Sequence, residues 1–388
     1  MASVEEQLEI IRRGADKILS EKELAEKLKS GRPLRVKLGV DPTAPDIHFG
    51  HTVPLNKLRQ FQQLGHQVVL IIGDFTATVG DPTGRSATRP PLTREEVLEN
   101  AKTYIDQAFL VLDKEQTEVV FNGEWFQKMS YPDILKLNAQ VTMGQMLQRE
   151  DFKKRIDEGK EVRLHEIQYP IMQGWDSVVI KSDVEIGGSD QLFNILVGRD
   201  LQKAEGMDPQ VVLTLPLLEG LDGVKKMSKS LNNYIGLTDT PNDMFGKLMS
   251  ISDELMARYY LLLLGQELDT SLHPMEAKKQ LGIALVDRYH GEGAGQAARD
   301  NWDKPDKEAE LTILPLSGIP ENPTVLTVAA HAFLTCFDLK KSSAELRRLI
   351  PGGAVQLNGE KMTDFSAEVS LKEGDVLRLG KKHSVRVG

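Results

Sequence analysis

The sequence predicts a mixed α/β protein in which a doubly wound parallel sheet is followed by an α-helical region and a small α+β module. The sheet is predicted because short apolar runs alternate with segments of helical spacing through the first half of the chain. This alternation is typical of parallel strands covered by helices on both faces. The chain is long enough for two or three domains, since its 388 residues exceed the roughly 150 that one domain usually takes.

The N-terminal elements are expected in the order helix, strand, helix, strand. The first helix is charged and amphipathic, the first strand alternates apolar and other residues, and the second strand is an uninterrupted apolar run. Gly65 is a natural end for the second helix. The expected spans are, in order, 4–30, 34–40, 53–64 and 68–72.

The alternation of helices and strands continues to about residue 223. Thr93 and Glu96 have the spacing of a capping box, which indicates the start of another helix. Further strands are expected at 117–121, 184–186 and 211–215, with a helix through Leu201 between the last two. Repetition of this kind requires a sheet buried on both faces.

The remainder of the chain has a different pattern. Residues 241–290 are helical in spacing, with Ser252 as an N-cap, and prolines between 305 and 323 indicate a connecting segment. In the last part, 344–349 is an expected helix and Asn358-Gly359 an expected hairpin turn.

We therefore expect a Rossmann-like domain at 1–223, an α-helical domain with its linker at 224–321, and an α+β domain at 322–388. The charge is uneven between these parts. The whole chain carries a net −9, whereas 322–388 carries +3, so the rest carries −12. The overall charge argues against a protein that coats nucleic acid, and contact with a polyanion is expected at the C-terminal end.

Composition also bears on the compartment. Cys336 is the only cysteine, so no intrachain disulfide and no clustered-cysteine zinc site can form. The N-terminus lacks a basic region followed by an apolar run, and the longest leucine run, 261–264, is too short to span a bilayer. We expect a cytoplasmic protein without a membrane segment.

The first candidate site is the segment from Asp41 to His51, between a strand and the start of a helix. Backbone N–H groups and the helix dipole favour an anion such as a triphosphate there. His48 and His51 share one face and can donate to a phosphate, and Gly50 lets a flat ring approach the backbone. Two histidines at this spacing are also found in metal sites, but the sequence offers no third ligand.

The second candidate site is the run Lys225 to Ser230, which follows Gly220 and Gly223. Glycines before it predict a loop that can move, and its lysines can stabilise a departing pyrophosphate. A lysine-rich loop alone is usually only solvated. Its combination with the histidine segment about 175 residues upstream favours a function in phosphate chemistry.

The two runs His48-Phe49-Gly50-His51 and Lys226-Met227-Ser228-Lys229-Ser230 resemble the signature motifs of class I aminoacyl-tRNA synthetases. Nearly the whole chain is similar to bacterial tyrosyl-tRNA synthetases, in the branch with a literal Lys-Met-Ser-Lys-Ser loop. The segments that carry this closer resemblance are 39–44, 80–82, 169–176 and 187–191. It implies that tyrosine and ATP give tyrosyl-adenylate and pyrophosphate, and that the tyrosyl group then passes to the 3′-terminal adenosine of tRNA(Tyr).

The same resemblance implies roles for individual residues. Phosphates would be held by Thr43, His48, His51, Lys226 and Lys229, with Ser230 in the same loop. Gly50 would face the adenine, and Gly188 and Asp190 the ribose. The tyrosine ammonium would be bound by Asp81, Tyr169 and Gln173, the phenol hydroxyl by Asp176, and the reacting carboxylate would lie near Gln191, with Asp41 in the same set. Mg²⁺ would accompany ATP without a dedicated protein cage, and no permanently bound cofactor or metal is expected.

Activation of a carboxylate that is already ionised needs positioning and charge stabilisation, not a strong base. Tyr169, Gln173 and Asp176 have the spacing of one helix face, which without the flanking motifs would be an ordinary polar surface.

Two residues depart from the best-known bacterial branch. Lys37 stands where that branch has tyrosine, and Glu185 where it has glutamine. Lys37 could pair with Asp176 or another carboxylate and so belong to the tyrosine site, or point into solvent at the sheet edge.

The resemblance also implies partners. The C-terminal module is similar to an S4-like RNA-binding domain, with candidate RNA contacts at Lys340, Lys341, Arg347, Arg348, Lys381 and Lys382. The family is homodimeric, and the helix-forming stretch 138–146 is a candidate interface. The alternatives are a tryptophanyl-type synthetase, a small-molecule adenylyltransferase and a non-catalytic RNA-binding relative.

Overall fold

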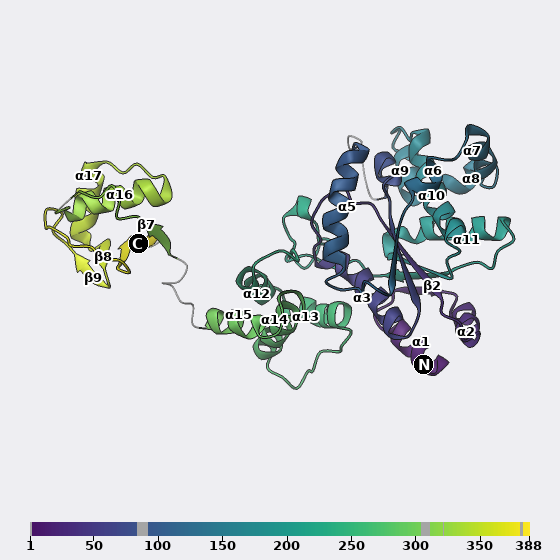
Figure 1. Cartoon of the computed structure of the whole chain (residues 1–388), viewed down its shortest axis with the longest axis horizontal. Helices are drawn as coiled ribbons and strands as arrows, with labels where there is room; N and C mark the ends of the chain where they lie inside the picture. The colour runs from purple at the N-terminus through teal and green to yellow at the C-terminus, as the bar shows by residue number, and fades with distance from the viewer. Residues whose placement is uncertain (1, 84–91, 304–310, 321, 381–382) are drawn as a thin grey trace. The chain divides into compact units, whose positions relative to one another are not determined.

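A computed structural model of the chain describes residues 2–83, 92–303, 311–320, 322–380 and 383–388 (Figure 1). The chain divides into two compact units, Met1–Trp302 and Asp303–Gly388. The second unit therefore begins before residue 322. The further division of the first part at residue 223 stays a prediction.

The first unit is built on a six-stranded sheet in the order β1-β6-β5-β2-β3-β4. All neighbouring strands are parallel except β1, which pairs antiparallel with β6 at the edge. The chain proceeds from β2 outward through β3 and β4, then returns to β5 and proceeds outward through β6, which makes the sheet doubly wound as predicted. The strands are β1 (Lys17–Leu19), β2 (Arg35–Val40), β3 (Gln67–Ile72), β4 (Thr117–Phe121), β5 (Val184–Gly188) and β6 (Val211–Leu215).

Side chains of β3 alternate between the two faces of this sheet. Val68 and Leu70 pack into a core with helices α3 (Phe49–Gln63) and α5 (Arg94–Ala108), whereas Val69 and Ile71 pack against Ile180 on the other face. Helices α10 (Leu164–Val179) and α11 (Leu192–Ala204) cover that second face (Figure 1). Because both faces are covered, β3 is apolar from Val68 to Ile72, as expected for a buried parallel strand.

The predicted single helix over 4–30 is wrong. The structure has α1 (Val4–Arg12), the edge strand β1, and α2 (Glu21–Lys29) in that stretch. Ser3 and Ser20 each form a capping box at the start of a helix. Gly14, shortly after the end of α1, adopts φ +73°, a backbone conformation that glycine reaches without the steric cost of a side chain. The caps therefore divide the amphipathic pattern into two short helices.

Short helices complete the segments around the sheet. The stretch 138–146, predicted as helix-forming, contains the last residue of one helix and the whole of a second, four-residue helix, with a turn over 139–142 between them. These short helices are α4 (Thr76–Val79), α6 (Gly123–Phe126), α7 (Tyr131–Asn138), α8 (Met143–Met146) and α9 (Glu150–Asp157).

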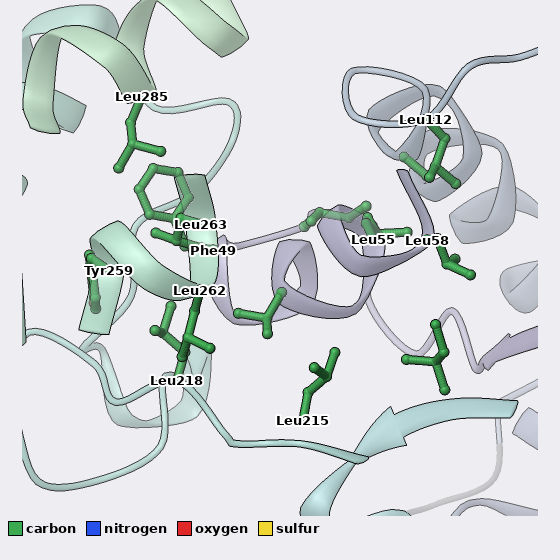
Figure 2. Packing of buried hydrophobic residues seen from close by; sticks show 14 of the residues in the cluster. Phe49, Leu55, Leu58, Leu112, Leu215, Leu218, Tyr259, Leu262, Leu263 and Leu285 are labelled. Atoms are coloured by element: carbon green, nitrogen blue, oxygen red, sulfur yellow. The ribbon is translucent and has the colours of Figure 1, made fainter. Parts of the chain in front are cut away.

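The helices that follow the sheet share its core. Phe49 and Leu55 of α3 and Leu215 of β6 pack in one cluster with Tyr259 and Leu285 of the later helices (Figure 2). Ser252 caps its helix as predicted. The later helices are α12 (Pro241–Met249), α13 (Asp253–Tyr259), a π-helical turn (Tyr260–Leu264), α14 (Pro274–His290) and α15 (Ala294–Asp303). No described helix is long and apolar enough to cross a membrane.

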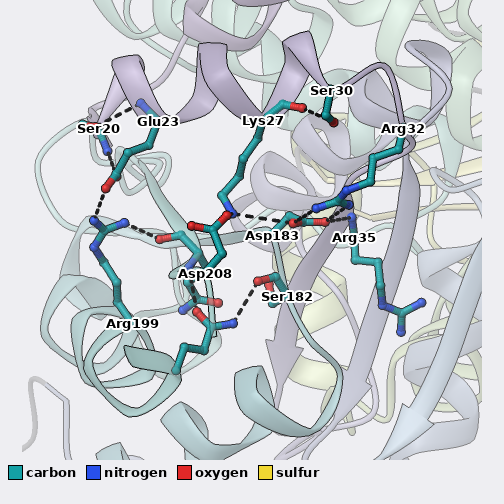
Figure 3. Close-up of polar contacts among 12 residues, drawn as sticks. Ser20, Glu23, Lys27, Ser30, Arg32, Arg35, Ser182, Asp183, Arg199 and Asp208 are labelled. Carbon is teal, nitrogen blue, oxygen red and sulfur yellow. Dashed lines mark hydrogen bonds and ion pairs between the residues drawn. The ribbon is translucent and has the colours of Figure 1, made fainter. Parts of the chain in front are cut away.

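A network of charged residues ties the amino ends of the strands to α2 (Figure 3). Asp183, just before β5, accepts two hydrogen bonds from Arg32 at 2.7 and 2.6 Å and one from the backbone N–H of Arg35 at 2.9 Å. Lys27 lies 3.6 Å from the same carboxylate and 2.5 Å from Asp208. This network stands at the edge of the sheet opposite the carboxyl ends of its strands.

The second unit has its own sheet and core. Its strand order is β7-β11-β10-β8-β9, and its core includes Val328, Leu346 and Val385. Asn358 and Gly359 have positive φ and form the predicted hairpin turn. The predicted connecting segment 305–323 contributes the strand β7, although 304–310 and 321 lie outside the described residues. The elements are β7 (Thr312–Leu314), α16 (Val325–Phe337), α17 (Ser343–Leu349), β8 (Val355–Leu357), β9 (Glu360–Met362), β10 (Val376–Leu379) and β11 (His383–Val387).

Candidate functional site

A cavity of about 450 Å³ opens at the carboxyl ends of the strands, where β2 and β5 are neighbours. Its wall contains the residues at or just after the ends of strands, among them Asp41, Gly73, Asn122, Gly188 and Leu215. The chain runs away from β2 and β5 in opposite directions, and open α/β sheets bind ligands at such switch points. The volume is in the range of small-molecule sites.

Most of the residues predicted from the sequence line this cavity. They are Thr43, His48, Gly50, His51, Gly188, Asp190 and Lys226 of the predicted ATP set, and Asp41, Asp81, Tyr169, Gln173, Asp176 and Gln191 of the predicted tyrosine set. Lys229, Ser230 and Lys37 are not part of the lining. The cavity wall thus brings together residues from segments up to about 185 residues apart in the sequence.

The two histidines begin α3. His48 is its N-cap, and its Nδ1 accepts the backbone N–H of Gly50 at 3.1 Å. His51 returns the contact, since its Nδ1 accepts the backbone N–H of His48 at 3.2 Å. Because each Nδ1 is an acceptor, the proton of each neutral ring is on Nε2. Each imidazole can therefore donate one hydrogen bond from Nε2.

Both rings stay neutral around pH 7. Burial lowers the pKa of His48 to about 2, helped by the charges of His51 and Lys229. Burial and Lys229 lower the pKa of His51 to about 4. The ring centroids are 3.9 Å apart, so protonation of one would place a charge against the other. The pair is thus a set of neutral donors at a helix N-terminus, beside orphan backbone N–H groups.

Glycine is required at position 50 by the His48 ring. A Cβ there would lie 2.9 Å from Cε1 of His48 and 3.6 Å from Cβ of Met227. Any side chain at this position would displace the imidazole from its capping position. The glycine therefore keeps the histidine in place as well as leaving room above the helix.

Asp176 lies on α10, almost fully buried, and is held by two donors. Trp125 donates its indole N–H to Oδ1 at 3.0 Å, and Asn122 donates from Nδ2 to Oδ2 at 3.3 Å. Burial raises the pKa of Asp176 to about 7, although the charge of Lys37 and these two hydrogen bonds oppose the shift. Lone pairs of the carboxylate remain for a donor in the cavity.

A chain of hydrogen bonds connects Asp176 to the other wall. Asn122 also donates to Oγ1 of Thr76 at 3.0 Å, Thr76 donates to Asp41 at 2.8 Å, and Tyr169 donates its hydroxyl to Asp41 at 2.9 Å. Burial, together with the charges of Asp41 and Asp81, holds the pKa of the Tyr169 hydroxyl well above its usual value of 10.0. Tyr169 therefore stays protonated and remains a donor to Asp41.

Asp81 lies in a second polar cluster. It accepts from Nε2 of Gln191 at 2.8 Å and from the backbone N–H of Thr83 at 2.9 Å. Asn194 donates to both Gln191 and Gln173 at 3.0 Å, and the buried Arg149 lies 3.6 Å from Asp81. The polar side chains of this wall are thus fixed by one another.

Lys37 is fully buried beneath the cavity and pairs with Glu185, one of the two possibilities left open by the sequence. Its Nζ lies 3.0 Å from Oε1 of Glu185, 2.7 Å from Oγ of Ser177 and 2.9 Å from the carbonyl oxygen of Gln173. The solvent-exposed alternative is therefore wrong.

The second motif forms a loop held by a buried asparagine. Asn233 accepts the backbone N–H of Ser228 at 2.8 Å and donates to Asp222 at 3.0 Å. Lys226 lies 3.7 Å from Asp190, and Lys229 lies 3.2 Å from Asp46. Burial raises the pKa of Asp190, while the charge of Lys226 opposes the shift. Both lysines have an acidic partner in this structure and can exchange it for another anion.

The predicted cations of the second unit differ in their surroundings. Lys340 and Arg348 are exposed, Lys341 pairs with Glu345 at 2.5 Å, and Arg347 lies 5.4 Å from the ring centroid of Phe365. Lys381 and Lys382 lie outside the described residues.

Sequence reasoning missed several residues of the site. Asn122, Thr76, Arg149 and Asn194 received no role. Asn122 had a usable signal, because it directly follows a predicted strand, as Asp41 does. Arg149 had none, since it reaches Asp81 only through the fold. In the described parts of the chain, no three or more His, Cys, Asp or Glu side chains form a group that could hold a metal ion.

The chain is similar to known proteins. Residues 29–303 match the family described as class I tRNA synthetases (W and Y). The chain is 51% identical to the Tyrosine–tRNA ligase of Aquifex aeolicus, over 99% of this chain and 98% of that protein. It is 49% identical to the Tyrosine–tRNA ligase of Geobacter sulfurreducens, over 99% of each. A C-terminally truncated mitochondrial tyrosyl-tRNA synthetase of Coccidioides posadasii superposes with a TM-score of 0.61 at 26% identity, covering 76% of this chain and 91% of that one.

Proposed function

The chain belongs to the class I tRNA synthetases for tryptophan and tyrosine, and on that premise we propose that it is a tyrosine–tRNA ligase. It activates tyrosine with ATP and transfers the tyrosyl group to the 3′-terminal adenosine of tRNA(Tyr). The relatives that are about 50% identical over the full length are named Tyrosine–tRNA ligase. The family as a whole includes synthetases for tryptophan as well as for tyrosine.

One observation carries the proposal. A single cavity has a buried carboxylate, Asp176, in one part of its wall and two neutral imidazoles at a helix N-terminus in another. The first feature suits a phenol hydroxyl, and the second suits a phosphate. A cavity that contains both can hold the two substrates side by side, as their reaction requires.

Asp176 reads the phenol hydroxyl. With Oδ1 occupied by Trp125 and Oδ2 by Asn122, the carboxylate has a fixed orientation and still accepts one more hydrogen bond. Phenylalanine would leave this buried acceptor without its partner, which is costly. The substrate ammonium binds among Asp81, Tyr169 and Gln173, where the cluster around Asn194 fixes the acceptors.

Activation joins a carboxylate oxygen of tyrosine to the α-phosphorus of ATP and breaks the bond to the bridging oxygen, so that pyrophosphate leaves with the electron pair. No proton transfer is needed. His48 and His51 donate from Nε2 to phosphate oxygens, and Lys226 and Lys229 leave their acidic partners to follow the charge onto pyrophosphate. Thr43 also contacts phosphate, Gly50 faces the adenine, and Gly188 with Asp190 holds the ribose.

Mg²⁺ enters with ATP as part of the substrate, bound to phosphate oxygens. It would neutralise charge on the phosphates, while His48, His51, Lys226 and Lys229 orient them. In the second step a ribose hydroxyl of the tRNA attacks the tyrosyl carbonyl, the bond from that carbonyl to the phosphate oxygen breaks, and the hydroxyl proton passes to the phosphate of the departing AMP.

The second unit binds RNA through its exposed cations. Its positive balance supports this, since phosphate contacts dominate the affinity of proteins for nucleic acid. Lys340 and Arg348 are exposed, and Arg347 also presents its guanidinium at the surface beside Phe365. Lys341, Lys381 and Lys382 complete the proposed set.

The protein acts as a homodimer in the cytoplasm, where its substrates occur. Large apolar side chains of α7 and α8 support association, because Tyr131, Leu135 and Met143 are each more than half exposed. Sedimentation of the wild type and of Leu135→Asp would test this, since a charge in the interface would favour monomers.

ATP–pyrophosphate exchange with purified protein and Mg²⁺ tests the activation step, with tyrosine, tryptophan and phenylalanine assayed separately. Exchange with tyrosine alone is expected. Exchange with tryptophan alone would assign the chain to the other branch of its family. Exchange with none would overturn the proposal.

A further inference from the structure

A buried ion pair lies beneath the cavity without taking part in its lining. Lys37 of β2 and Glu185 of β5 are register partners on neighbouring parallel strands, and their side chains are 0% and 1% exposed. A buried pair is costly to desolvate and is retained only with good geometry and further hydrogen bonds. This pair has both.

The hydrogen bonds of the pair are complete. The three N–H groups of Lys37 point to three acceptors, namely Glu185, Ser177 and the carbonyl oxygen of Gln173. Glu185 accepts from Nε2 of Gln173 at 3.1 Å, from Ser177 at 2.9 Å and from Nε2 of Gln210 at 2.5 Å. The pair therefore holds α10 at the turn that carries Gln173 and Asp176.

Glu185 also determines the orientation of the Gln173 amide. An ionised carboxylate can only accept hydrogen bonds, so the NH₂ group of Gln173 must face it. The amide oxygen then faces Asn194 and keeps a lone pair for a donor in the cavity. A glutamine at position 185 could accept or donate and would permit the opposite orientation.

Lys37 acts on Asp176 through charge. The charged groups that face Asp176 are Lys37 from β2 and Glu185 from β5, while its direct partners Asn122 and Trp125 are neutral. About two turns earlier on α10, Tyr169 is protonated, and the charges of Asp41, Asp81 and Asp176 act on its hydroxyl. Lys37 is thus the cation that favours the ionised form of Asp176, and Glu185 moderates its effect.

We infer that Lys37 and Glu185 are positioning residues for tyrosine selection, which orient Gln173 toward the substrate ammonium and keep Asp176 charged for the phenol hydroxyl without touching the substrate. This inference rests on the proposed function. It assigns a joint role to the two residues at which the sequence departs from the best-known bacterial branch.

Three variants test the inference: Lys37→Met, Glu185→Gln, and the double variant Lys37→Met/Glu185→Gln. The KM values for tyrosine and for ATP are measured by pyrophosphate exchange at several pH values between 6 and 8.5. Below its pKa of about 7, Asp176 is protonated, so the KM for tyrosine of the wild type rises as the pH falls.

Lys37→Met should move this rise to higher pH, because the cation that opposes protonation is lost. Glu185→Gln should move it to lower pH, because it removes a negative charge that raises the pKa of Asp176. In the double variant the rise in the KM for tyrosine should move in the same direction as in Lys37→Met. The double variant leaves no buried unpaired charge, so it can replace Lys37→Met in the test if that variant fails to fold. At pH 7 the KM for tyrosine should rise about tenfold in Lys37→Met, with the KM for ATP unchanged.

Lys57→Met is the matched control. Lys57 is also buried, but its Nζ donates to the carbonyl oxygens of Ile10, Ile11 and Arg13, and it is not part of the cavity wall. Its loss should lower stability and leave the pH profile of the tyrosine KM unchanged. An unchanged profile in Glu185→Gln and the double variant, or equal shifts in the control, would overturn the inference alone. Failure of the wild type to activate tyrosine would overturn the proposed function and, with it, the inference.

Discussion

His48 and His51 fix each other's tautomer. Nδ1 of His51 accepts the backbone N–H of His48, and Nδ1 of His48 accepts the backbone N–H of Gly50. Each ring therefore presents Nε2–H, and the two rings stay neutral because burial lowers their pKa values to about 2 and 4. In this arrangement the pair stabilises charge by donation and takes up no proton.

The rate of adenylate formation should therefore show no histidine titration. An ordinary histidine titrates near pH 6.5, but the lowered pKa values keep both rings neutral throughout pH 5.5–8. His48→Ala should slow the step by on the order of a hundredfold and leave tyrosine affinity nearly unchanged, because one donor to the phosphate is lost. Single-turnover kinetics at saturating tyrosine over this pH range would check both points. A histidine-dependent acid limb would contradict the tautomer assignment.

Asp176→Asn should weaken tyrosine binding by about 1.5–3 kcal/mol, because a hydrogen bond to a charged acceptor is lost. Discrimination against phenylalanine should fall by a similar amount. In the wild type, tyrosine affinity should decline as the pH falls through about 7, since the raised pKa protonates Asp176 there. Calorimetric titration of both proteins at pH 6 and 8 measures this, and the variant should show no such decline.

Lys229→Ala should slow pyrophosphate exchange by on the order of a hundredfold, with little change in the KM for tyrosine. Lys229 pairs with Asp46 at 3.2 Å and is free to move to the phosphates when ATP binds. Lys225→Ala is the matched control on the same loop, because Lys225 is exposed and is not among the residues proposed to contact ATP. Equal loss of rate in both variants would indicate a general effect on the loop.

Truncation after Trp302 should preserve tyrosine activation and impair tRNA charging. Each unit has its own core, and β7 belongs to the sheet of the second unit, so the cut must precede residue 312. Pyrophosphate exchange and aminoacylation of tRNA(Tyr), measured on the same preparation, separate the two steps. Retained charging at physiological salt would refute an RNA-binding role for the second unit.

Asp183→Asn should lower the free energy of unfolding by about 2–4 kcal/mol, because it removes the acceptor shared by Arg32 and Lys27. Although burial raises the pKa of Asp183, its hydrogen bonds from Arg32 bring it below the usual 3.8. The stabilisation is thus present above pH 3.8 and is lost as the pH falls through the lower, folded-state pKa. Urea unfolding at several pH values checks this, and Asp208→Asn, whose side chain is 78% exposed, should cost less than about 1 kcal/mol.

Much of the fold could be predicted from local patterns. The strands at 68–72 and 211–215 were found because a strand covered on both faces is mostly apolar, and the strand at 117–121 was found from its strand-forming residues. The N-terminal helix was predicted as one piece because periodicity alone does not register the caps at Ser3 and Ser20. The strand β7 was missed because three residues form a strand only where a neighbouring strand pairs with them.

The sequence by itself determined the residue types of the site and their order along the chain, since motifs at strand ends and a helix N-terminus follow from local chemistry. Only the tertiary structure decided which of these side chains form hydrogen bonds and ion pairs with one another. Lys37 and Glu185 meet because β2 and β5 are neighbours in the sheet, although 148 residues separate them in the sequence. Asp176 receives Asn122 and Trp125 for the same reason, because β4 and α10 are brought together by packing on one face. Burial, which raises one pKa and lowers others, exists only once these elements are assembled.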